Sequence, residues 1–211
     1  MIEAILPGAV ASVEAFQDPP NGRLFPEEEA IIARAVERRR REFTTARMCA
    51  HAALAKLGLA PVPILRGERN APVWPAGVVG SITHCAGYRA AVVAHSRDLT
   101  AIGIDAEPNE PLPAGVLDAI ALPRELPQLA QLPERVCWDR VLFCAKEAVF
   151  KVWYPLTARN LGFEEAHVQI APAGQFHATL LTRHPNLPPV LAGRYLHNCS
   201  HVVTAITLPA S

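Results

Sequence analysis

The order of helical and strand patterns along the chain limits its fold most strongly. Residues 26–58 carry the apolar spacing of helices, and residues 78–95 alternate as strand, tight turn and strand. Residues 101–107 have the pattern of a short strand, residues 135–156 that of a strong helix, and residues 167–208 that of antiparallel strands. Helices and strands grouped in this way predict an α+β fold.

The same order predicts two halves of about a hundred residues each, which is within the usual size range of a domain. Residues 1–98 would form the first half and residues 99–211 the second. We expect each half to be a small antiparallel sheet packed with helices, and the two to form one compact unit. There is no convincing sequence repeat between the halves, so a duplication stays an open question.

Charge and cysteine content exclude several classes of protein. Twenty Lys and Arg residues offset twenty Asp and Glu residues, so no global charge would draw the chain to nucleic acid or to a membrane. No apolar run approaches the roughly 20 residues that span a bilayer. The first residues lack the basic charge of a signal peptide, and five cysteines without a C-x-x-C spacing fit a reducing compartment. We therefore expect a cytoplasmic protein.

Prolines and glycines indicate where the elements end. The first helical region should consist of two helices with a break near residues 41–44, and Pro155 should end the later helix soon after it. A tight turn is expected at Ala86–Gly87. The Pro- and Leu-rich residues 108–135 should form a long excursion with a short helix at residues 116–122.

The motif Asp105-Ala106-Glu107 places two carboxylates close together. On a strand, Gly103, Asp105 and Glu107 share one face, and the isoleucines on the other face would enter the core. The glycine would leave the acidic face open. Two carboxylates at this spacing can share a hard cation such as Mg²⁺. The alternative is a strand end whose solvent face is acidic.

The helix at residues 135–156 carries Lys146, Glu147 and Lys151. Glu147 and Lys151 are four residues apart and lie on one helix face, where such a pair is commonly a surface stabiliser. The surrounding residues leave little polar face, which favours a buried helix. Charged side chains inside a buried helix are costly unless they meet charged ligands.

Two further motifs contain residues that can carry a positive charge. His84 ends the segment Gly80-Ser81-Ile82-Thr83-His84, where it could bind an anion or serve only as a structural residue. In the arginine run at residues 38–41, Arg40 lies almost in line with Arg47 on a helix, and Arg39 is turned by about 80°. Such an arginine face can hold a terminal phosphate, although it is more often merely solvated.

Together these motifs resemble one family. They occur in the order R-R-x-E-F-x-x-x-R, G-x-x-x-x-P-x-W-P, G-S-x-T-H-C, G-I-D-x-E and K-E-A-x-x-K over residues 26–170. This order resembles the 4′-phosphopantetheinyl transferases of the two-half, pseudo-symmetric, monomeric type, such as the enterobactin-synthetase activators. The actinobacterial, mycobacterial-like members are the most similar.

The resemblance implies an activity. Such an enzyme binds coenzyme A and Mg²⁺, with Mn²⁺ as the alternative ion, and accepts an apo acyl or peptidyl carrier protein of fatty-acid, polyketide, siderophore or non-ribosomal peptide synthesis. A serine hydroxyl of the carrier attacks the β-phosphate, phosphopantetheine moves to the serine, and 3′,5′-ADP leaves. Positioning and charge neutralisation would account for most of the catalysis.

The resemblance also assigns roles to residues. Catalysis would depend on Glu147 as the base, on Lys151 at the pyrophosphate and on Asp105. The motif selects Arg39 as a phosphate ligand, whereas helix periodicity selects Arg40. The metal ligands would be Asp105, Ala106, Glu107 and Glu147. Coenzyme A would contact Arg39, Arg47, Arg66, Gly67, Glu68, Arg69, Thr83, His84, Asp105, Glu147, Lys151 and Leu161.

Two other functions remain as alternatives. A Mg²⁺-dependent hydrolase of a nucleotide pyrophosphate would use the same carboxylates with water as the nucleophile. A non-catalytic module that binds carrier proteins or coenzyme A would need the cations but not the complete set of Asp105, Glu107, Glu147 and Lys151. The identity of the carriers is not indicated by the sequence.

Overall fold

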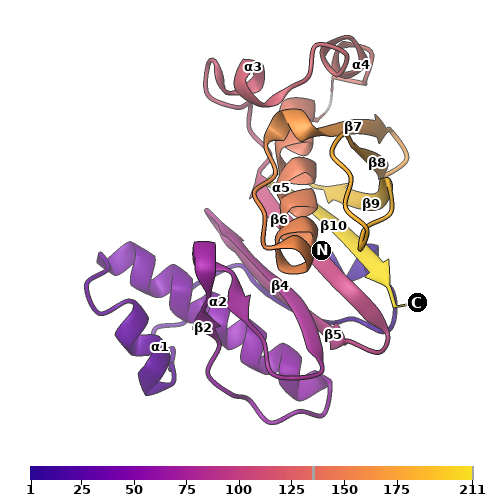
Figure 1. The fold of residues 1–211 in the computed structure, drawn as a ribbon. Helices are drawn as coiled ribbons and strands as arrows, with labels where there is room; N and C mark the ends of the chain where they lie inside the picture. The colour runs from indigo at the N-terminus through magenta and orange to yellow at the C-terminus, as the bar shows by residue number, and fades with distance from the viewer. Residues whose placement is uncertain (135, 211) are drawn as a thin grey trace.

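A computed structural model describes residues 1–134 and 136–210. Its first half is a three-stranded antiparallel sheet in the order β1-β5-β4, covered on one face by α2 (Figure 1). A two-stranded ribbon, β2-β3, lies beside it. The elements of this half are η1 (Ile2–Ile5), β1 (Ala11–Ala15), α1 (Pro26–Ile31), α2 (Glu37–Lys56), β2 (Leu65–Arg66), η2 (Glu68–Asn70), β3 (Pro72–Val73), β4 (Val78–Cys85) and β5 (Tyr88–His95).

The second half is a five-stranded antiparallel sheet in the order β6-β10-β9-β8-β7, packed against α5. The short helices α3 and α4 lie beyond one end of α5 (Figure 1). The elements are β6 (Leu99–Pro108), α3 (Val116–Ile120), α4 (Leu126–Ala130), α5 (Trp138–Thr157), η3 (Phe163–Glu165), β7 (Ala166–Ala171), β8 (Gln175–Leu180), β9 (Val190–His197) and β10 (His201–Pro209). The predicted α+β fold with two halves of sheet and helix is confirmed.

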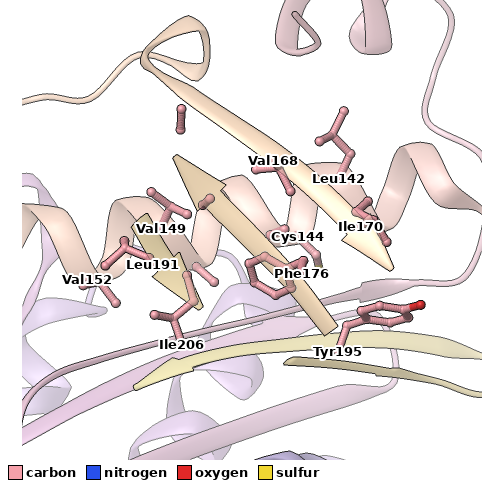
Figure 2. Packing of buried hydrophobic residues seen from close by; sticks show 14 of the residues in the cluster. Leu142, Cys144, Val149, Val152, Val168, Ile170, Phe176, Leu191, Tyr195 and Ile206 are labelled. Atoms are coloured by element: carbon pink, nitrogen blue, oxygen red, sulfur yellow. The ribbon is translucent and has the colours of Figure 1, made fainter. Parts of the chain in front are cut away.

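Helix α5 is the centre of the larger hydrophobic core. One face of this helix meets the inward side chains of the strands from β7 to β10, as Figure 2 shows for Val149 and Phe176. The predicted burial of this helix is therefore correct, and Pro155 lies inside its last turn, two residues before it ends. The predicted start at Arg135 lies outside the described residues.

The two sheets meet along β4 and β6 without a backbone ladder between them. The hydroxyl of Ser81 accepts the N–H of Ile104 at 3.1 Å, and the hydroxyl of Thr83 accepts the N–H of Ala106 at 3.0 Å. Two side-chain hydroxyls thus accept the backbone N–H groups that the carbonyls of a neighbouring strand would accept in a continuous sheet. We call this contact the β4–β6 joint.

The break in the first helical region is not where the sequence predicted it. The chain leaves the helical conformation between Ile32 and Val36, and α2 runs unbroken through residues 41–44. Arg40 explains the difference, because its Nη1 donates to the carbonyl oxygens of Ile32 at 3.1 Å and Ala33 at 3.4 Å. These carbonyls end α1, where a guanidinium group is a suitable partner.

The acidic face of β6 is open to solvent only in part, because Asp105 is buried and Glu107 is half-buried, contrary to the expectation from the sequence. Gly103 lets α5 approach closely, because a Cβ atom built there would lie 2.1 Å from the carbonyl oxygen of Ala148. Asp105, on the same face, is therefore covered and only 6% exposed. The glycine serves helix packing.

Turns and the excursion follow the predictions more closely. The β4–β5 turn lies at Ala86–Gly87, and Gly87 has the left-handed backbone that such a turn requires. The short helix expected near residue 116 is α3, and α4 is a second short helix in the excursion that was not predicted. Among residues 1–134 and 136–210, no helix combines the length and the apolar character needed to cross a membrane.

Candidate active site

A cleft of about 520 Å³ opens between the halves, beside the β4–β6 joint. Helix α2, the loop after β2, strand β4 and helix α5 all contribute to its walls. The structure therefore brings together residues that are far apart in the sequence. The predicted site residues that line this cleft are Arg39, Arg47, Arg66, Arg69, His84, Glu147 and Lys151.

Arginines form one wall of the cleft. The guanidinium group of Arg47 lies over the ring of Phe43 at 4.4 Å, and that of Arg66 lies 5.4 Å from the same ring. Burial lowers the pKa of Arg47 to about 10, which still leaves the side chain charged at neutral pH. Its Nε donates to the carbonyl of Ile64 at 3.0 Å. The wall holds several cations side by side, as a phosphate site requires.

His84 joins this wall through Arg39. Nη1 of Arg39 lies 2.6 Å from Nε2 of His84. Burial and the nearby Arg39 lower the pKa of His84 to about 4, so the ring is neutral at neutral pH in this state. Arg40 points elsewhere, because it binds the end of α1. The geometry therefore places Arg39, the residue selected by the motif, beside His84.

The loop that contains Arg66, Gly67, Glu68 and Arg69 extends toward the second half of the chain. Nη1 of Arg69 donates to Asn160 at 3.0 Å, and the hydroxyl of Tyr154 lies 3.5 Å from a carboxylate oxygen of Glu68. Glu68 and Arg69 thus contact the segment around the end of α5. The loop borders the cleft where the two halves face each other.

Asp105 lies behind the cleft wall and is held by three donors. Its Oδ1 accepts from Lys151 at 2.8 Å and from the hydroxyl of Thr83 at 3.1 Å, and its Oδ2 accepts from the thiol of Cys144 at 3.2 Å. Helix spacing left a surface pair of Glu147 and Lys151 as an alternative, but Lys151 forms its ion pair with Asp105. Thr83 also accepts from Ala106, as described for the joint.

The other two carboxylates of the predicted metal site differ in their surroundings. Glu107 accepts from Nη1 of Arg140 at 3.1 Å, whereas Glu147 lines the cleft. Burial, followed by repulsion from Asp105, raises the pKa of both Glu107 and Glu147. The three carboxylates therefore repel one another across a short space.

A divalent cation would relieve this repulsion, and oxygen donors suit Mg²⁺. Within the described part of the chain, however, no three His, Cys, Asp or Glu side chains are grouped closely enough to hold a metal ion. The reason is visible in the contacts, because Lys151 holds Asp105 and Arg140 holds Glu107. The donor chemistry fits a metal, and these two carboxylates would have to exchange partners to bind it.

Leu161 lies apart from the main cleft. It lines a second hollow of about 340 Å³, which shares Glu147 and Phe150 with the first. Lys146 borders this hollow but is only 3% exposed, and it forms a 2.8 Å ion pair with the buried Glu125. Its charge therefore has a structural partner.

Several residues near the site were not singled out from the sequence. Glu42 lies 3.9 Å from His84, Phe43 supports two arginines, and Arg140 and Cys144 hold the acidic residues. Glu42 and Phe43 are the last two letters of R-R-x-E-F, and that motif was the available signal. Nothing in the local pattern indicated Arg140 or Cys144.

Comparison with known families decides the identity of the chain. Residues 27–94 match the 4′-phosphopantetheinyl transferase N-terminal domain, and residues 101–204 match the 4′-phosphopantetheinyl transferase superfamily. This chain belongs to the 4′-phosphopantetheinyl transferase superfamily. The two matched ranges lie in the first and second half of the fold, and together they include every predicted site residue that lines the cleft.

Individual transferases match nearly the whole chain. It is 50% identical to 4′-phosphopantetheinyl transferase Npt of Nocardia iowensis over 98% of this chain and 99% of that protein. Svp of Streptomyces mobaraensis is 51% identical over 100% of this chain and 90% of its own length. PptT of Mycobacterium tuberculosis is 46% identical over 99% and 98%.

The predicted family, including its actinobacterial branch, is confirmed, as is the prediction that the chain is a transferase. The enterobactin synthase component D proteins also match and are more distant relatives.

Proposed function

We propose that this transferase moves the 4′-phosphopantetheine group of coenzyme A to a serine of an apo carrier protein in the cleft between its halves. The products are the holo carrier and 3′,5′-ADP. One observation carries the proposal: the arginine wall, Glu147 and Lys151 line the same cleft, in a chain that matches transferases along nearly its whole length.

Coenzyme A would lie along the cleft. Its 3′-phosphate would meet Arg39, Arg47 and His84, which are neighbours in the wall. The loop from Arg66 to Arg69, with Gly67 and Glu68, would border the adenine. The pyrophosphate would reach Lys151, and Leu161 would contact the cofactor only from the second hollow.

We propose that Asp105, Glu107 and Glu147 hold Mg²⁺, or Mn²⁺, with the carbonyl of Ala106 as a further ligand. Support comes from the raised pKa of Glu107 and Glu147, which reflects first their burial and then repulsion from Asp105. When bound, the ion would neutralise charge on the pyrophosphate.

The chain's own residues would act on the carrier serine and the pyrophosphate. Glu147 would take the proton of the serine hydroxyl while the serine oxygen forms a bond to the β-phosphorus. The bond from that phosphorus to the bridging oxygen would break, and the electron pair would leave with 3′,5′-ADP. Burial and Asp105 raise the pKa of Glu147, which makes its carboxylate a stronger base than an exposed one. Lys151 would stabilise the negative charge on the leaving group.

The remaining expectations belong to the same proposal. The enzyme would act as a cytoplasmic monomer, with its halves divided between residues 98 and 99. Carrier proteins would dock near α5 and the excursion at residues 108–135, with neither nucleic acid nor a membrane as a partner. The arginine wall would make the cleft entrance locally positive, although the whole chain has no net charge.

The test is the intact mass of an apo carrier protein after incubation with the enzyme, coenzyme A and Mg²⁺. We expect the mass of one phosphopantetheine to be added, and expect EDTA or Glu147→Gln to prevent it. Glu27→Gln, a change at an exposed glutamate of α1, is the matched control and should keep full activity. Cleavage of coenzyme A without transfer would favour the hydrolase. If the protein binds coenzyme A but neither cleaves it nor modifies any of several carrier proteins, the non-catalytic module is favoured.

A further inference from the structure

His84 lies between two side chains of α2. Arg39 and Glu42 are three residues apart and therefore share a helix face. Nε2 of the ring meets Nη1 of Arg39 at 2.6 Å, and Nδ1 lies 3.9 Å from Oε2 of Glu42. A guanidinium group can only donate, so Nε2 accepts and the single proton of the neutral ring is on Nδ1. That proton faces Glu42.

Glu42 is a largely buried carboxylate, only 9% exposed, with cations around it. Nε of Arg38 donates to its Oε1 at 3.0 Å, and Nη2 of Arg89 lies 4.0 Å from the same oxygen. Arg89 has a second carboxylate partner in Asp18, at 3.0 Å. Glu42 and Asp18 thus share one arginine, and of these two carboxylates Glu42 is the one that lies within ion-pair distance of His84.

A phosphate group imposes a requirement on this histidine. Phosphate oxygens accept hydrogen bonds, so a phosphate held by both Arg39 and His84 needs Nε2 as a donor. If the single proton moved to Nε2, the lone pair of Nδ1 would face the Glu42 carboxylate at 3.9 Å, which is repulsive, so a ring with protons on both nitrogens fits these two partners best. Arg39, Arg89 and Lys151 oppose that charge and Glu42 favours it, while burial keeps the pKa of the free ring at about 4.

We propose that Glu42 is a positioning residue, whose carboxylate faces Nδ1 of His84 at ion-pair distance and balances the ring's charge when Nε2 is protonated to bind the 3′-phosphate of coenzyme A. This inference rests on the proposed function, since it takes the arginine wall as the 3′-phosphate site. The second proton comes from solvent, and no covalent bond between heavy atoms changes. The phosphate and Glu42 would bracket the imidazolium ring, one on each nitrogen.

The test compares two ligands that differ in one group. Dissociation constants for coenzyme A and for 3′-dephospho-coenzyme A are measured by calorimetry on the full chain, in two buffers of different ionisation enthalpy. The pair of buffers gives the number of protons taken up on binding. The variants are Glu42→Gln and the matched control Asp18→Asn, which removes the other carboxylate of Arg89 but not the one beside His84.

We expect the wild-type protein to prefer coenzyme A and to take up more protons with it than with 3′-dephospho-coenzyme A. Glu42→Gln should reduce this preference by about tenfold and lower the extra proton uptake, with little change for 3′-dephospho-coenzyme A. Asp18→Asn should keep the wild-type preference. The inference is wrong if Glu42→Gln keeps the preference, or if it weakens both ligands equally, as a purely structural role would.

Two further outcomes keep the inference separate from the proposed function. If wild-type protein binds both ligands equally, the wall is not the 3′-phosphate site, and the proposed function fails at that point together with the inference. If Glu42→Gln does not fold, the wild-type protein decides: equal proton uptake with the two ligands overturns the inference, and greater uptake with coenzyme A supports it.

Discussion

The ammonium group of Lys151 lies 2.8 Å from Oδ1 of Asp105 and 2.9 Å from the carbonyl oxygen of Ile104. A third contact, of 3.4 Å, reaches the carbonyl of Ile82 on β4. One cation therefore neutralises a buried carboxylate and contacts both strands of the β4–β6 joint. The same group is placed at the cleft, where the pyrophosphate would lie.

Lys151→Met should remove the cation that both neutralises Asp105 and would meet the pyrophosphate. We expect the rate of phosphopantetheine transfer to fall by about 10²–10³-fold, the usual effect of losing one stabilising group in an active site. The measurement is carrier mass against time. Lys56→Met is the control, because Lys56 also donates to a carbonyl, that of Ser12 at 2.7 Å, but does so away from the cleft. Equal losses for both variants would contradict a specific role.

Magnesium should stabilise the protein more strongly as the pH rises. In the metal-free fold the pKa of Glu107 and Glu147 lies above its ordinary value. Their protonated forms thus favour folding at low pH, and that contribution is lost as the pH rises through the raised pKa values. A cation binds the ionised forms, so the increase in Tm caused by Mg²⁺ should be larger at pH 7.5 than at about pH 5.

Thermal unfolding with Mg²⁺ or with EDTA, at several pH values, measures this increase. Glu147→Gln removes one ionisable ligand and should reduce the increase at pH 7.5. An increase that does not vary with pH in the wild-type protein would contradict the assignment of these carboxylates to a metal site.

The buried ion pair of Lys146 and Glu125 should contribute strongly to the stability of the fold. Lys146 also donates to the carbonyls of Ile120 and Phe163 at 2.8 and 2.9 Å, so one side chain joins α5, the excursion and the loop before β7. Lys146→Met leaves a buried carboxylate without its cation, which should cost about 3–5 kcal/mol of unfolding free energy. Urea denaturation measures the loss.

A second variant separates charge from packing. Glu125→Gln keeps an acceptor for the N–H of Val168, at 2.6 Å, but removes the charge. Combined with Lys146→Met, it should recover part of the lost stability. The exposed pair of Arg41 and Glu37 is the control, and Arg41→Met should cost less than about 1 kcal/mol. A double variant no more stable than Lys146→Met would argue against the unpaired charge as the cause.

Gly103→Ala should disrupt the packing of α5 on β6. The added methyl group would lie 2.1 Å from the carbonyl oxygen of Ala148, so helix and strand would have to separate. Overpacking of this kind costs about 1–3 kcal/mol or more. Gly8→Ala is the matched control, because a Cβ atom at Gly8 meets nothing within 4 Å. Urea midpoints should fall for the first variant and stay unchanged for the second.

The sequence was sufficient to predict the kind and order of the main elements. The short apolar runs of β4, β5 and β10 and the apolar density of α5 are local patterns, and both the α+β class and the hairpin turn at Ala86–Gly87 followed from them. The helix break was misplaced because its actual position depends on Arg40, which caps α1 from the next helix. That contact has no signature in the local spacing.

At the site, too, local spacing did not reveal contacts with elements that are distant in the sequence. Spacing alone selected Arg40 over Arg39, yet the fold turns Arg39 toward His84. Spacing also paired Glu147 with Lys151, whereas β6 brings Asp105 within reach of that lysine. In both cases an element distant in sequence supplies the partner, and only the tertiary fold determines which partner that is. The ordered motifs were informative because four of the five contribute residues to the lining of this one cleft, and the remaining one, G-I-D-x-E, supplies Asp105, the ion-pair partner of the cleft residue Lys151.

Strand β6 has a consequence for how the protein is made. It is the edge strand of its sheet and pairs there with β10, so that Asp105 lies opposite Thr204 and Glu107 opposite Val202. A chain emerging from the ribosome would carry the arginine wall, His84 and both acidic residues long before β10 is synthesised. The carboxylates gain their backbone support only then, so a nascent enzyme should acquire activity abruptly, once β10 has been synthesised and has paired with β6.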